Sequence, residues 1–210
     1  MGHLLDSEIL MGERGIVRDV VEQLFNPAYG LLSPVGIRTL ERDAVRFDAG
    51  GYHTGQVWLW DNLKIADGLA RHGFHGLAWE LRARMVEVCT TLHLLPEFVR
   101  GGDDPTARVN ERVVDAIRID QSGNERLCRI EQPPQDVQAW SVAGMVRVNA
   151  LLRGVAAGGR SAPPTAARNP FTRREEARLL RRIGRTQRLA LPALLSSVAA
   201  GGVELLSAGG

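Results

Sequence analysis

The sequence predicts a mainly α-helical protein with one small β-hairpin, and three observations lead to this expectation. Apolar residues recur at helical intervals in several segments, a short glycine-containing turn joins two of these segments, and one region combines β-branched residues with a turn signal. The 210-residue chain is long enough for one domain with a substantial core, with or without a tail.

The first helix is expected over residues 6–25. Its apolar residues return every three or four positions, with interruptions near Gly12 and Gly15, and Pro27 ends the pattern. Residues 26–56 then lack sustained periodicity. A connection of this length inside a compact domain is more often functional than idle.

Two further helices are expected to form an antiparallel pair. Apolar spacing predicts one helix from Asp61 to Gly73 and another over 77–92, which ends before Pro96. The turn at 72–76 is short, so the two helices should be neighbours in space.

A β-hairpin and another helix follow. Residues 113–119 and 126–130 are rich in β-branched and apolar side chains and flank the turn signal at 121–124, which is typical of a hairpin. After the Pro133-Pro134 pair, residues 137–152 are expected to be helical.

The charge is divided unevenly along the chain. Residues 1–153 hold 17 basic and 21 acidic side chains, whereas residues 154–210 hold 9 and 3, so the net charge of +2 and the pI of about 8.8 reflect the C-terminal part. Because the larger part has no basic stripe, nucleic-acid binding is not expected. Residues 154–210 are interpreted as an extension rich in Arg, Ala and Gly. It is expected to be largely disordered, with a possible basic amphipathic helix in 172–191 that would suit a membrane surface or a partner.

No metal, cofactor or membrane segment is predicted. Cys89 and Cys128 are expected to be reduced, packed thiols of a cytoplasmic protein. His72 and His75 have the spacing of a ligand pair, but they flank Gly73 without an acidic or cysteine partner, so a solvated turn is expected. The sequence has no run of about 18 apolar residues, and its first residues do not have the pattern of a secretory leader, so neither a membrane span nor export is expected.

The segment Tyr52-His53-Thr54-Gly55-Gln56-Val57-Trp58-Leu59-Trp60-Asp61-Asn62 has the side chains of a sugar-binding pocket. Aromatic rings stack on the apolar face of a pyranose, and carboxylates and amides bind its hydroxyls. Only 5% of the chain is aromatic, and the rings are concentrated here. The alternative is a Trp-rich helix start that packs in the core.

Five other strings occur with this segment in a fixed order. They read Gly-His-Leu-Leu at 2–5, Gly-Ile-Arg-Thr-Leu at 36–40, Leu-Leu-Pro-Glu-Phe at 94–98, Ile-Glu-Gln-Pro-Pro-Gln at 130–135 and Gln-Ala-Trp-Ser-Val-Ala at 138–143. Together, over residues 2–152, the series resembles the C-terminal part of the amylo-α-1,6-glucosidase (glycogen debranching) superfamily of glycoside hydrolases. The resemblance implies that residues 1–153 are part of an (α/α)6 toroid, of which this chain would supply about four helices.

Glu97 is the candidate catalytic residue. Inverting glycosidases use two carboxyl groups held about 6.5–9.5 Å apart, one to protonate the leaving oxygen and one to activate water. The resemblance implies that the Glu of Leu-Pro-Glu is the general base, and Pro96 favours its display on a loop after a helix. Without the resemblance, a solvated loop glutamate would be the simpler interpretation.

Eight residues are candidate substrate ligands, each with a structural alternative. Tyr52 could be a ligand or a core residue, Asp61 could bind sugar or cap a helix, and Trp140 could lie at the mouth or in the core. Trp58 and Trp60 should point to opposite sides if they are extended, so that one lines the site and the other packs. The set is Tyr52, His53, Gln56, Trp58, Trp60, Asp61, Gln138 and Trp140.

The resemblance places the general acid on an earlier loop that this chain does not contain, and neither Asp43 nor Asp48 matches it. The isolated chain is therefore expected not to hydrolyse glycosides, and to self-associate or to associate with the missing part of the barrel. Two other functions remain open. One is a non-catalytic carbohydrate-binding or structural remnant, and the other is an interaction protein that acts through its basic tail.

Overall fold

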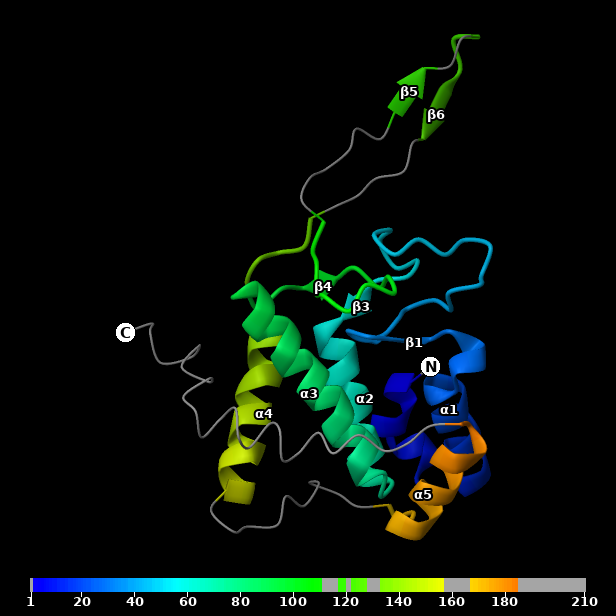
Figure 1. The fold of residues 1–210 in the computed structure, drawn as a ribbon, viewed down its shortest axis with the longest axis vertical. Helices are drawn as coiled ribbons and strands as arrows, with labels where there is room; N and C mark the ends of the chain where they lie inside the picture. The colour runs from blue at the N-terminus through cyan, green and yellow to red at the C-terminus, as the bar shows by residue number, and fades with distance from the viewer. Residues whose placement is uncertain (1, 111–116, 120–121, 128–132, 157–166, 185–210) are drawn as a thin grey trace.

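The computed structural model describes residues 2–110, 117–119, 122–127, 133–156 and 167–184, and the statements below concern these residues. Five α-helices provide most of the structure, and three two-stranded antiparallel sheets accompany them (Figure 1). The helices are α1 (Arg14–Phe25), α2 (Leu59–Arg71), α3 (His75–Leu92), α4 (Ala139–Ala156) and α5 (Arg173–Arg182). The sheets pair β1 (Leu32–Ser33) with β2 (Gly36–Ile37), β3 (Val57–Trp58) with β4 (Phe98–Val99), and β5 (Ile117–Ile119) with β6 (Glu125–Leu127).

The mainly α prediction is confirmed, but the first helix is shorter than expected. Two 3₁₀ helices, η1 (Gly2–Asp6) and η2 (Glu8–Leu10), precede α1, which begins only at Arg14. Gly12 lies in the break between them, whereas Gly15 lies within the first turn of α1.

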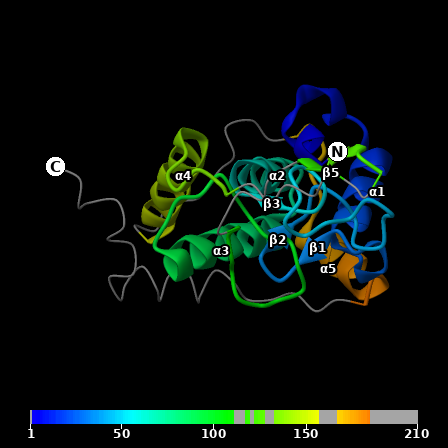
Figure 2. The same cartoon turned by 90° about the horizontal axis from the view of Figure 1, so that it is seen from above.

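The predicted antiparallel pair is α2 and α3, which lie side by side in both views (Figures 1 and 2). Gly73 makes the turn possible, since its φ of 92° lies in the left-handed region that side chains rarely adopt. A Cβ on Gly73 would also lie only 2.1 Å from the carbonyl oxygen of Phe171. The turn therefore also serves as the docking point for the segment that precedes α5.

One core cluster joins the N-terminal segment to α1, α2, α3 and α5. Gly68 of α2 packs so closely against η1 that a Cβ there would lie 2.5 Å from the backbone nitrogen of Asp6. Asp6 also forms ion pairs with Lys64 and Arg71 of α2. The largest fully buried side chains of this cluster include Phe25, Phe74, Leu5, Leu69, Leu77 and Leu81.

The C-terminal helix belongs to this core, in agreement with the partly helical extension that the sequence allows; residues 157–166 and 185–210 lie outside the described residues. The basic amphipathic helix predicted within 172–191 is confirmed as α5, and its apolar side buries Leu179, Leu180 and Ile183. Thr172 and Glu175 form a capping box at its start. The charge pattern of the sequence predicts this helix. Only the structure shows that its apolar side packs in the core cluster formed by α1 and α3.

Glu176 of α5 holds the start of α3. Its buried carboxylate accepts a hydrogen bond of 2.9 Å from the backbone N–H of Leu77, one of the first N–H groups of that helix. Burial raises the pKa of Glu176, while the backbone N–H groups of Leu77 and Gly76 oppose the shift. Phe74, the N-cap residue of α3, makes no side-chain capping hydrogen bond. The Glu176 carboxylate therefore satisfies a backbone N–H group at this end of α3 in its place.

A second core cluster lies between α2, α3, α4 and the β3–β4 pair. Gly144 of α4 faces Leu63 of α2, where a Cβ would come within 2.4 Å of a Leu63 methyl carbon. The predicted helix over 137–152 is confirmed as α4. The predicted hairpin is confirmed as β5–β6, which pairs Ile117 with Leu127 and turns at Gly123, whose φ is 82°.

Cys89 is a free, buried thiol, and burial raises its pKa to about 12, as expected for a packed cysteine. Cys128 lies outside the described residues. Among the helices that the structure describes, none combines the length and the apolar character needed to cross a bilayer.

Leu180→Ala tests whether α5 is part of the cooperative core. Leu180 is 2% exposed, so its truncation should lower the free energy of unfolding by about 2–5 kcal/mol, measured by urea denaturation. Arg181→Ala on the exposed side of the same helix is the control, with an expected change within about 0.5 kcal/mol. Equal stability of the two variants would show that α5 melts independently of the core.

His72 is buried, so the prediction of a solvated turn is wrong at this residue, although His75 is exposed. Burial lowers the pKa of His72 below 6.5; a hydrogen bond to the Leu5 carbonyl opposes the shift, and the charge of Arg71 adds to it. The turn is buried because η1 and the Phe171 segment cover it.

A pH series tests this assignment. The folded state binds the proton of His72 less readily than the unfolded state, so its contribution to stability is complete above 6.5 and is lost as the pH falls below that value. In urea titrations between pH 7.5 and pH 5, His72→Gln should lose less stability than the unmodified protein. Identical losses would contradict the assignment.

Candidate functional site

The β3–β4 pairing brings two distant strings of the sequence together. Trp58 lies opposite Phe98, and Val57 lies opposite Val99, in an antiparallel register. Glu97 directly precedes this pair, and the segment 52–56 directly precedes β3. The aromatic segment and the Leu-Pro-Glu-Phe string therefore meet at one edge of the fold, at the start of α2 (Figure 1).

Four rings form a cluster at this edge. The rings of His53 and Trp58 are stacked, with centroids 4.7 Å apart and planes within 3° of parallel. Tyr52 meets both of them edge to face, at 4.3 Å from His53 and 5.3 Å from Trp58. Phe98 closes the cluster at 5.2 Å from Trp58. Such tilted and stacked contacts are the arrangements that aromatic pairs prefer.

The exposed members of this ring cluster are Tyr52 and His53. Tyr52 is 42% exposed and His53 is also exposed, whereas Trp58 is only 6% exposed beneath the His53 ring. His53 has a φ of 59°, in the left-handed region that a residue with a side chain rarely adopts. The surface available to a ligand is therefore the Tyr52–His53 face, and Trp58 supports it from below.

Glu97 is held by backbone contacts on both sides. Its N–H donates to the carbonyl of Gln135 at 3.0 Å, and the Ser141 hydroxyl of α4 donates to the carbonyl of Pro96 at 2.7 Å. The N–H of Gln138 donates to the Leu95 carbonyl at 3.0 Å. The start of α4 thus fixes the loop that displays the half-buried Glu97 side chain.

Tyr52 and Glu97 interact electrostatically. Partial burial raises the pKa of the Tyr52 phenol above its ordinary value of 10.0, and the negative charge of Glu97 and a hydrogen bond to it raise the pKa further. The phenol therefore remains protonated and can donate to the carboxylate. This interaction ties the ring cluster to the candidate base.

Gln56 lies inside the fold rather than at the surface of the site. It is fully buried, and its Nε2 donates to the Gly50 carbonyl at 2.9 Å. Asn110 donates to the same carbonyl at 2.8 Å, and it accepts from Arg100. A sequence pattern places an amide near a site but does not show whether it points inward. Gln56 shapes the Gly50–Gly51 turn beneath Tyr52.

Arg38 is a structural residue that the sequence analysis did not single out. Its buried guanidinium donates to the carbonyls of Gly30, Gly101 and Gly102, and it forms an ion pair with Asp103. It thereby fixes the loop after β4 against the segment after η3 (Pro27–Tyr29). The sequence feature that could have drawn attention to Arg38 is its position in the Gly-Ile-Arg-Thr-Leu string. Hydrophobic periodicity does not predict that an arginine is buried.

The other candidate ligands form a separate group on α2 and α4. Trp60 and Trp140 are 6.4 Å apart between centroids, and Lys64 lies 5.8 Å from the Trp60 ring. Trp140 is 57% exposed, which rules out the core alternative. Trp58 and Trp60 therefore belong to different clusters. The expectation of opposite sides assumed an extended backbone, whereas Trp60 lies in the first turn of α2.

Asp61 and Gln138 lie at helix starts. The alternative that Asp61 caps its helix is wrong, because α2 begins at Leu59 and Asp61 lies within the first turn, where a negative charge is still favourable. The strand pairing of Trp58 sets this earlier start. Gln138 precedes α4, and its Oε1 atom is buried without a hydrogen-bond partner among the described residues.

Comparison with family models gives one match. Residues 10–96 match the model of the mannosylglycerate hydrolase MGH1-like glycoside hydrolase domain, which supports a glycoside hydrolase-like domain in this chain. The matched region covers α1, α2, α3 and the aromatic segment, and it stops one residue before Glu97. No curated protein matches the chain. Within the described residues, no group of three or more His, Cys, Asp or Glu side chains is placed to hold a metal ion.

The Tyr52–Glu97 interaction can be tested by titrating the phenol. In a Tyr29→Phe background Tyr52 is the remaining tyrosine, and its absorbance midpoint should lie above 10.0. Glu97→Gln should lower that midpoint because it removes the negative charge that disfavours phenolate. Glu87→Gln on the exposed side of α3 serves as the control and should leave the midpoint unchanged. Equal midpoints in the two variants would separate Glu97 from Tyr52.

Proposed function

We propose that this chain is part of an inverting glycoside hydrolase in which Glu97 is the general base and the Tyr52–His53 face binds the sugar. The β3–β4 pairing is the observation on which the proposal rests, because it sets a carboxylate beside a partly exposed ring cluster. The match of residues 10–96 to a glycoside hydrolase domain supports the class of reaction. The base itself lies just outside that match and rests on the resemblance and on this geometry.

The chemistry asked of Glu97 is the removal of a proton from water. As the water oxygen attacks the anomeric carbon, one of its protons passes to the carboxylate, and the bond to the leaving oxygen breaks as that oxygen takes a proton from the general acid. Tyr52 would keep the carboxylate oriented by donating to it, which leaves the other oxygen of Glu97 for the water. Tyr52 therefore acts as a positioning residue in this proposal.

Sugar binding would use the exposed side of the ring cluster. The Tyr52 ring offers a flat apolar surface, and the His53 ring nitrogens offer a donor and an acceptor for hydroxyls. Trp58 would act from beneath, since its stacking fixes the His53 ring. Trp60, Trp140, Asp61 and Gln138 would belong to the outer part of the same substrate path, along the starts of α2 and α4.

An α-glucosidic bond of the debranching type is the first candidate substrate, from the resemblance of the sequence. The matched family description adds a second candidate, a sugar–glycerate conjugate such as mannosylglycerate. The two differ in the leaving group and not in the role of Glu97. We further propose that the general acid comes from outside the residues identified here, so that this chain binds glycosides without hydrolysing them.

A glycosyl fluoride separates the base from the acid. Fluoride leaves with little need for protonation, so α-glucosyl fluoride requires the activated water but not the missing acid. The chain should release fluoride from it while leaving maltose and isomaltose intact. Glu97→Gln should lower the fluoride-release rate by about 100-fold or more, and Glu87→Gln should not.

Two results would change this proposal. Fluoride release that is equal in the Glu97→Gln and Glu87→Gln variants would remove Glu97 as the base and leave a carbohydrate-binding module or a structural remnant. Release of glucose from maltose or isomaltose that disappears with Glu97→Gln would keep the base and contradict the missing acid.

Binding is tested by tryptophan emission, because Trp58 contacts both exposed rings. Maltose, isomaltose and mannosylglycerate are titrated in turn, and the one that binds should change the emission. Tyr52→Ala should weaken this binding by about tenfold, the size of one lost ring contact. Tyr29→Ala is a matched control, since Tyr29 is also 42% exposed. Equal affinities in the two variants would place the sugar elsewhere.

A further inference from the structure

A hollow of about 430 Å³ lies between α1 and α5, away from the proposed sugar site. Its floor is at the α2–α3 turn, where Phe171 donates a backbone hydrogen bond to the His72 carbonyl. The sugar site lies at the other end of α2, whose 13 residues span roughly 20 Å. The volume lies within the range of about 300–1,000 Å³ that small-molecule pockets occupy.

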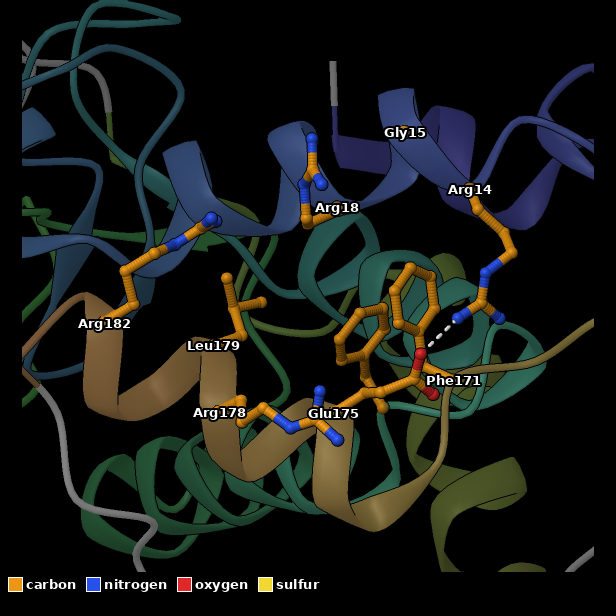
Figure 3. Close-up of a pocket in the computed structure, with 9 residues that line it drawn as sticks. Arg14, Gly15, Arg18, Phe171, Glu175, Arg178, Leu179 and Arg182 are labelled. Atoms are coloured by element: carbon orange, nitrogen blue, oxygen red, sulfur yellow. Dashed lines mark hydrogen bonds and ion pairs between the residues drawn. The ribbon is translucent and has the colours of Figure 1, made fainter.

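The floor of this hollow is apolar. Phe74 is fully buried, Phe171 is half-buried, and their ring centroids are 4.5 Å apart. Leu179 of α5 adds an aliphatic side chain that is 6% exposed. Figure 3 shows the Phe171 ring in the space between the two helices. The floor is therefore suited to a planar or aliphatic group rather than to a hydrated ion.

Two ion pairs join α1 to α5 on either side of the hollow. Arg14 of α1 reaches Glu175 of α5 at 2.6 Å, and its guanidinium also covers the Phe171 ring at 4.0 Å (Figure 3). At the other end, Arg182 of α5 pairs with Glu22 of α1. The other residues that line the hollow lie between these two contacts or beside them.

The remaining charges on the wall are the guanidinium groups of Arg18 and Arg178. Among the described residues, Arg18 pairs only with its neighbour Asp19, at 3.0 Å. Both side chains are about half exposed or more, so this pair contributes little. Arg178 makes no hydrogen bond or ion pair within the described part of the chain, although its charge lowers the pKa of Glu175. One carboxylate, that of Glu175, and four guanidinium groups line the hollow.

We propose that this hollow binds a small amphiphilic anion, with its apolar body on Phe74, Phe171 and Leu179 and its carboxylate or phosphate between Arg18 and Arg178. Arginine is suited to both head groups because its planar fork donates two parallel hydrogen bonds. A ligand would bring a negative charge to two exposed guanidinium groups, of which Arg18 pairs only with the exposed Asp19 and Arg178 forms no ion pair within the described residues. This site is independent of the sugar-binding proposal, which involves the opposite end of α2.

Calorimetric titration of the full chain at low salt tests the proposal with phenyl phosphate and phenylacetate as probes. At least one of them should bind with one-to-one stoichiometry, and the comparison identifies the preferred head group. Inorganic phosphate lacks the apolar body, and benzyl alcohol lacks the anionic head group. Each should therefore bind about tenfold more weakly than the better probe, or not at all. Higher salt should weaken binding because the head group meets exposed charges.

Variants locate the site. Arg18→Gln and Arg178→Gln should each weaken binding of the better probe by roughly tenfold, while Arg174→Gln should not. Arg174 is a matched control because it is an exposed arginine of α5 that does not line the hollow. Circular dichroism should show equal melting of all three variants, since none of these arginines joins α1 to α5.

A measurement without variants gives an independent check. Phenylglyoxal modifies accessible arginines, and saturating probe should protect Arg18 and Arg178, but not Arg174, in peptide mass spectra. Equal affinity in the Arg178→Gln and Arg174→Gln variants, binding of inorganic phosphate as tight as that of phenyl phosphate, or absence of protection would each overturn the proposal.

Discussion

The arrangement of the candidate site depends on the two-residue pairing between β3 and β4. Strands this short contribute few hydrogen bonds, so their register must be held by the side chains around them. Val57, Val99 and Phe98 are almost completely buried, and they fix which face of each strand points into the core. A shift of one residue would turn Phe98 away from Trp58 and would carry Glu97 away from Tyr52. The catalytic proposal therefore rests on core packing more than on the site residues themselves.

The same edge of the fold contains several groups that are unfavourable in isolation. His53 adopts a left-handed backbone conformation, and the indole N–H of Trp58 and the Oε1 atom of Gln56 are buried without partners among the described residues. Each unsatisfied buried group costs about 1–3 kcal/mol, and strained residues of this kind gather at functional sites. The stacking of His53 on Trp58 offsets part of this cost. The cluster thus has the features of a site whose geometry is maintained by its surroundings.

The opposite end of the molecule depends on close backbone approaches. Gly73 leaves room for the Phe171 carbonyl, and Gly68 leaves room for the backbone of η1. The segment before α5 and the N-terminal segment therefore both pack closely against the C-terminal part of α2 and the turn that follows it. Glu176 then caps α3 from α5. These contacts hold the α2–α3 turn and the start of α5 together at the floor of the hollow between α1 and α5.

The sequence by itself determined the helical class, the antiparallel α2–α3 pair, the hairpin and the amphipathic nature of α5. Each of these follows from local periodicity, turn chemistry or charge, which act over a few residues. It also placed Tyr52, His53 and Glu97 among the candidate residues, because the strings that contain them are chemically distinctive. The resemblance and the family match agree on a glycoside hydrolase class.

Tertiary structure alone decided which of those residues face a common surface. Gln56 and Trp58 share a segment with Tyr52, yet one is fully buried in the loop network and the other lies beneath His53. The burial of His72, the inward-facing Arg38 and the place of α5 in the core depend in the same way on segments far apart in the chain. Local spacing sets the direction of a side chain relative to its own strand or helix, whereas burial depends on which distant element covers it.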